Sequence, residues 1–93
     1  MFRNLDEAVT RLEEIDTLLM NPEVLSNRRR LMEVTRDRAH LVPILTTWQE
    51  LDSAQTELEE ARELMDDPEM REMAVEEIKR LNGQIPDLEG RLR

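Results

Sequence analysis

The sequence predicts an all-α protein built from long antiparallel helices. Apolar residues recur at intervals of three and four positions along most of the 93 residues, which is the period of one face of an α-helix. Glycine occurs twice, and β-branched residues are sparse beside Leu, Met, Glu, Arg and Ala. This composition favours helix over sheet. A chain of this length is expected to form one domain.

The first helix is predicted at about residues 4–20. Asn4 can act as its N-cap, with Glu7 three positions later in an arrangement close to a capping box. The helix should stop at Asn21, because Pro22 has no N–H and disfavours helical geometry in the residue before it. The apolar face of this helix consists of Leu5, Ala8, Leu12, Ile15 and Leu19.

The second helix is predicted at about residues 27–65, after a short connector. Ser26 or Asn27 is a suitable N-cap. The apolar spacing continues through Trp48, which is expected to anchor the core. Because Pro43 removes one helical hydrogen bond, we expect a kink or a break between Ala39 and Pro43.

The third helix is predicted at about residues 68–92. Asp67 as N-cap and Pro68 in the first helical position form a typical helix start. Gly83 and Gly90 weaken the helix, and Pro86 is expected to bend it or to end it near Ile85. Three methionines flank the turn and are expected to pack at that end of the bundle: Met65, Met70 and Met73.

Two short connections make sequential helices antiparallel neighbours. The helices are long for 93 residues, so the prediction is an elongated antiparallel three-helix bundle or coiled-coil-like hairpin. So small a core leaves little net stability, and docking to a second domain or self-association is therefore plausible.

Composition argues against several function classes. The chain has no cysteine, so disulfides, thiolate metal sites and cysteine nucleophiles are excluded. His40 is the only histidine, and it stands alone on a predicted helix rather than in a catalytic or metal-binding set. We therefore expect no enzyme activity, no cofactor and no metal site. No segment resembles a signal peptide or a membrane span, which makes the cytoplasm the default location.

Charge is distributed unevenly. The net charge of −9 disfavours direct nucleic-acid binding by this chain. The segment from Arg28 to His40, however, contains five arginines and two acids, whereas the segment from Glu50 to Glu77 contains twelve acids and two arginines. Three consecutive cations, Arg28 to Arg30, oppose the macrodipole at the start of a helix. They are either a contact site for nucleic acid or an acidic protein, or a solvated first turn.

Three stretches resemble one known family in order and spacing. Residues 66–74 read Asp-Asp-Pro-Glu-Met-Arg-Glu-Met-Ala, and residues 18–25 read Leu-Leu-Met-Asn-Pro-Glu-Val-Leu. Residues 41–44 read Leu-Val-Pro-Ile, at a Leu-x-Pro step. Together they resemble the N-terminal domain of bacterial class I peptide chain release factors, in the variant that reads UAA and UAG. The resemblance covers essentially the whole chain.

The resemblance implies that residues 1–93 are a single non-catalytic domain of a larger protein that acts in translation termination. In this family, later domains carry the Gly-Gly-Gln motif for peptidyl-tRNA hydrolysis and the Pro-x-Thr motif for codon reading; this sequence contains neither. The implied partners are the ribosome, through its stalk-base proteins, and the class II release factor GTPase. Candidate partner-binding residues are Arg28, Arg29, Arg30, Asp67, Glu69 and Arg71.

Two alternatives stay open at this stage. The chain could be a free-standing acidic helical adaptor or a chaperone-like coiled-coil protein. It could also belong to a ribosome-rescue relative of the release factors, which would share this domain.

Overall fold

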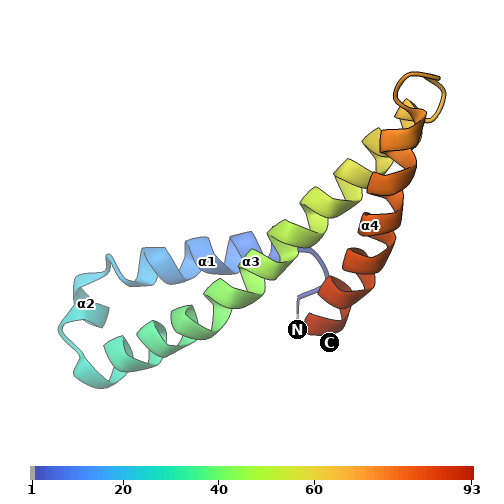
Figure 1. Ribbon diagram of the computed structural model, residues 1–93. Coiled ribbons are helices and arrows are strands. Elements are labelled where there is room, and N and C mark those ends of the chain that lie inside the picture. Colours follow the sequence, from blue (N-terminus) through green and yellow to red (C-terminus); the bar gives the residue numbers. More distant parts are fainter. Residues whose placement is uncertain (1) are drawn as a thin grey trace. The chain divides into compact units, whose positions relative to one another are not determined.

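The structure is a computed structural model that describes residues 2–93; Met1 lies outside this range. Four helices follow one another: α1 (Leu5–Leu18), α2 (Pro22–Leu25), α3 (Arg28–Leu64) and α4 (Arg71–Arg91). The described residues contain no strand, so the all-α prediction is confirmed. The chain divides into two compact units, one ending at Trp48 and the other running from Gln49 to Arg93 (Figure 1). α3 contributes its first half to one unit and its second half to the other.

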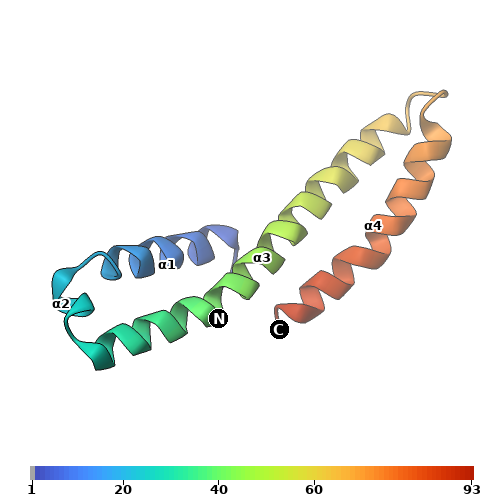
Figure 2. The same cartoon turned by 60° about the vertical axis from the view of Figure 1, so that its left-hand side comes forward.

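In the first unit, α1 lies beside the N-terminal half of α3 (Figures 1 and 2). Trp48 is partly buried and packs against the core of this unit, as predicted. Two ion pairs join the helices at their edge: Arg11 with Asp37 at 3.8 Å, and Arg38 with Asp16 at 2.9 Å. The buried core residues are Ala8, Ile15, Val24, Val34, Leu41 and Leu45.

In the second unit, α4 lies beside the C-terminal half of α3 in both views (Figures 1 and 2). Arg80 contacts Glu57 at 3.2 Å, and Arg91, later in α4, contacts Glu50, earlier in α3, at 3.8 Å. This order of contacts is that of antiparallel helices, as predicted. The buried residues of this unit are Leu51, Ala54, Ala61, Ala74, Leu81 and Leu88.

Both predicted asparagine caps are present. The Asn4 side chain accepts a hydrogen bond from the Glu7 N–H at 3.0 Å, and Asn27 accepts one from the Arg30 N–H at 3.1 Å. Each cap satisfies one of the backbone donors that a helix start leaves unpaired. The choice between Ser26 and Asn27 is thereby decided in favour of Asn27.

Of the kink or break predicted at Pro43 and the bend or end predicted at Pro86, neither the break nor the end occurs. α3 continues through Pro43, so a break there is excluded, and α4 continues through Pro86 to Arg91, so the expected end near Ile85 is wrong. Both prolines are exposed, and the carbonyl that each leaves without its helical hydrogen bond can be solvated by water. Buried leucines two residues away, on the side of the helix opposite each proline, hold each helix on its partner: Leu41 and Leu45 around Pro43, and Leu88 after Pro86.

The two connections also differ from expectation. Residues 22–25 form the short helix α2, because Pro22 starts it, Asn21 caps it and Val24 is buried in the first core. The helix predicted at residues 68–92, which is α4 in the structure, begins at Arg71, because Asp67 closes a local turn instead of capping a helix.

The methionines at this second connection are only partly in line with expectation. Met65 and Met70 are half-buried. Met73, in contrast, is 55 % exposed, so the expectation that it packs into the end of the bundle is wrong.

Candidate interaction surfaces

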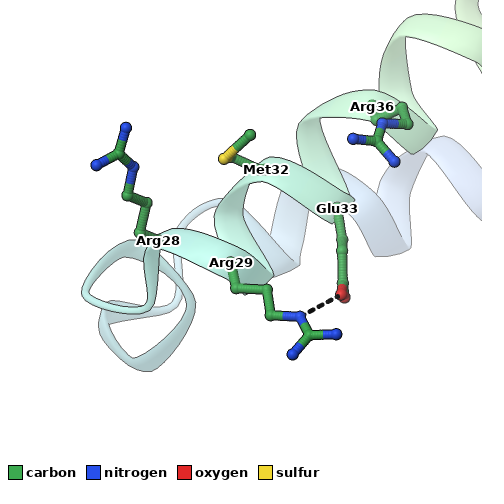
Figure 3. A pocket seen from close by; sticks show the side chains of 5 residues that line it. All are labelled: Arg28, Arg29, Met32, Glu33 and Arg36. Carbon is green, nitrogen blue, oxygen red and sulfur yellow. Dashed lines mark ion pairs between the residues drawn. The ribbon is translucent and has the colours of Figure 1, made fainter.

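The first turns of α3 carry an arginine-rich surface (Figure 3). Arg28, Met32 and Arg36 follow at intervals of four residues, which places them on successive turns of one helix face. All three are exposed, and Met32 keeps 54 % of its surface in solvent. We call this row the arginine face; with Arg29 and Glu33 beside it, it borders an open surface pocket. A partner could meet two cations and one apolar side chain here.

The arginines of this region differ in their pairing. Arg29 and Arg30 both contact Glu33, at 3.7 and 3.5 Å. Arg28 and Arg36 form no ion pair within residues 2–93. Of the three predicted residues Arg28 to Arg30, only Arg28 is therefore free of an ion pair within residues 2–93. Arg36, which was not predicted, is a second arginine on the same face that is unpaired within this range. The signal for Arg36 and Met32 was the four-residue spacing from Arg28, which sequence reasoning did not use.

The other predicted partner-binding residues lie in and just after the turn between α3 and α4: Asp67, Glu69 and Arg71. The Asp67 carboxylate accepts a hydrogen bond from the Glu69 N–H at 2.9 Å, and Arg71 Nε donates to the Met65 carbonyl at 3.0 Å. The side chains of Asp67 and Arg71 thus stabilise the turn itself. Glu69 is exposed and forms no side-chain hydrogen bond among the described residues. This group belongs to the second compact unit, whereas the arginine face belongs to the first.

A second surface was missed by sequence reasoning. Leu64 and Met73 are 36 % and 55 % exposed and line an open pocket whose wall includes the buried side chains of Ala61 and Ala74. The carboxylates around it are Glu57, Glu60 and Glu77. The signal in the sequence was a pair of large apolar residues beside the turn in an otherwise acidic stretch.

One electrostatic network stabilises the acidic side of the second unit. Arg80 donates hydrogen bonds to Glu77 on its own helix and to Glu57 on α3. The hydrogen bond from Arg80 lowers the pKa of the Glu77 carboxyl below its ordinary value of 4.5, against the smaller opposing effect of desolvation. The same contacts raise the pKa of Arg80. This network joins α3 to α4.

Within residues 2–93, no group of three His, Cys, Asp or Glu side chains could hold a metal ion. His40 is exposed on α3. No described helix is long and apolar enough to cross a membrane.

Comparison with known proteins places the chain in a family. The sequence profile of the PCRF domain matches residues 8–93. The chain belongs to the PCRF domain family. The resemblance to peptide chain release factors noted in the sequence is thus confirmed.

Curated relatives agree with this assignment. The chain is 33 % identical over 93 residues to the peptide chain release factor 1 of Geobacter sulfurreducens, which it matches over 100 % of its own length and 26 % of the relative's. It is also 33 % identical, over 96 residues, to the proteins of that name from a Geobacillus species and from Brevibacillus brevis. The chain spans about a quarter of the length of these relatives. No solved structure matches the chain significantly.

Proposed function

We propose that this chain is the non-catalytic, N-terminal interaction domain of a class I peptide chain release factor that acts in translation termination. The observation that carries the proposal is the family match over residues 8–93 together with relatives named peptide chain release factor 1. In this proposal the parent protein reads UAA and UAG stop codons and triggers peptidyl-tRNA hydrolysis through other domains. The chain itself works in the cytoplasm on the ribosome.

The proposed partners are the stalk-base proteins of the ribosome and the class II release factor GTPase. The surface chemistry supports a role in protein contact, because the chain exposes apolar side chains among charges at both ends of α3. Met32 is exposed among arginines, and Leu64 is exposed among glutamates. Exposed apolar residues surrounded by polar ones are typical of protein interaction sites.

Two experiments test the proposal. An antibody raised against these 93 residues should detect a native product several times larger than 11.0 kDa, and this product should sediment with ribosomes in lysate of the source cells. A single product near 11.0 kDa would contradict the proposal and favour a free-standing helical adaptor.

The second experiment addresses catalysis directly. In a reconstituted termination reaction, the purified 93-residue chain should release no peptide from ribosomes stalled at UAA, whereas the full native product should release it. Excess chain should slow release by the full product, because both compete for the same ribosomal contacts. Absence of any competition would argue that this domain does not contact the ribosome.

A further inference from the structure

We propose that the arginine face of α3 docks an acidic amphipathic helix of a protein partner. The inference rests on the part of the proposed function that makes this chain an interaction domain, and it adds where the contact lies and which chemistry it recognises. Carboxylates of the partner pair with Arg28 and Arg36, and an aliphatic side chain between them packs on Met32.

Geometry defines the partner's pattern. Arg28 and Arg36 are eight residues apart on one helix. At a rise of 1.5 Å per residue, their Cα atoms are separated by about 12 Å along the axis. A partner helix lying along this face presents two glutamates at the same separation when they too are eight residues apart. A leucine midway between them then lies opposite Met32.

Charge favours an anionic occupant. Residues 28–36 contain four arginines and one glutamate, in a chain whose net charge is −9. Glu33 is engaged by Arg29 and Arg30, so nothing among the described residues neutralises Arg28 or Arg36. Arg28 is also the first residue of α3, where the helix macrodipole disfavours a cation. An approaching carboxylate offsets this local repulsion.

The apolar component favours a protein over a nucleic acid. Met32 is 54 % exposed between the two cations, and a flexible thioether adapts well to aliphatic side chains. Recognition of single-stranded RNA instead relies on aromatic side chains that stack on bases. Residues 28–36 contain no aromatic, and the chain's two aromatics, Phe2 and Trp48, pack on the first core. The net charge of −9 further repels a polyanion.

The test is an NMR titration of the ¹⁵N-labelled 93-residue chain with a designed helical peptide. The peptide is Ala-rich and carries two glutamates eight residues apart with a leucine midway. We expect shifts concentrated on the backbone of residues 28–36 and on the side-chain Nε–H signals of Arg28 and Arg36. Replacing both peptide glutamates by glutamine should weaken binding at least about fivefold. Shifts spread over the whole chain, or none, would overturn the proposal.

Matched variants separate this face from net charge. Arg28→Glu with Arg36→Glu should weaken peptide binding by about tenfold or more. The control, Arg62→Glu with Arg93→Glu, changes the net charge equally at two exposed arginines that have no ion pair among the described residues, and it should weaken binding less than about twofold. Equal losses in the two variants would show a general charge effect and refute the site. Circular dichroism checks that both variants retain their helices.

Two further measurements test the apolar contact at Met32 and the alternative that this face binds RNA. Met32→Ser should weaken peptide binding about threefold, since a partly buried aliphatic contact is lost; no change would refute the anchor. A single-stranded RNA of matched charge should bind more weakly than the peptide, and tighter binding of RNA would overturn the choice of a protein partner. The size of the native product tests the parent protein and this titration tests the face, so each can fail without the other.

Discussion

Gly83 lies in the interior of α4 and offers a clean test of how that helix is stabilised. A Cβ built at Gly83 meets no atom within 4 Å, and the described glycines have no positive φ. An alanine therefore fits without strain. We expect Gly83→Ala to raise the free energy of unfolding by about 0.8–1 kcal/mol, because alanine restricts the unfolded backbone and glycine is the weaker helix former.

The matched control is Gly90→Ala. Gly90 is also open to a Cβ, but it is the next-to-last residue of α4. Helix ends fray, so the same substitution there should add only a few tenths of a kcal/mol. The difference between the two variants isolates the contribution of helix position from that of the side chain.

Urea unfolding followed by far-UV circular dichroism measures both variants, and amide hydrogen exchange shows whether protection rises within α4. For a protein of this size, a gain of about 1 kcal/mol corresponds to a rise in Tm of roughly 4–8 °C. A neutral or destabilising Gly83→Ala, or a gain no larger than that of Gly90→Ala, would refute the continuous path of α4 across Gly83 and Pro86.

Three further substitutions test a buried side chain, a helix cap and an ion pair of the structure. Leu81→Ala removes a side chain that is 0 % exposed and should cost about 2–5 kcal/mol in the free energy of unfolding by urea, with a cost below 1 kcal/mol arguing against its burial. Asn27→Ala removes the cap of α3 and should cost about 1 kcal/mol by the same assay, whereas Asn27→Asp should retain most of the stability. Arg80→Gln should raise the pKa of the Glu77 carboxyl toward 4.5 in an NMR titration. The pKa of Glu77 is lowered in the folded chain, so its contact with Arg80 stabilises the fold at pH values above the unfolded pKa. This stabilisation is lost as the pH falls through the folded pKa. The stability difference between Arg80→Gln and the parent chain should therefore shrink in acid.

Local signals in the sequence determined the three long helices, their approximate limits and the caps of two of them. The spacing of three and four made the apolar faces of α1, α3 and α4 readable, because one helix face repeats with that period. Asn4 and Asn27 were recognisable as caps, since a side-chain oxygen before a helix satisfies a backbone donor that the helix leaves free. The charge of Arg28 to Arg30 pointed to a candidate surface, and the run at residues 66–74 pointed to the family.

The tertiary structure alone decided what each of these elements packs against. The apolar spacing of α3 runs on past Trp48, yet its first half belongs to one core and its second half to another. Pro43 and Pro86 stay within helices because the burial of neighbouring residues on the same helix outweighs the lost hydrogen bond. The connector at residues 22–25 forms a helix because Val24 is buried in the first core. Asp67 accepts a hydrogen bond from the Glu69 N–H and the Arg71 side chain donates to the Met65 carbonyl, so both side chains stabilise the turn before α4 begins. Propensity is a weak local term, and burial against another element overrides it.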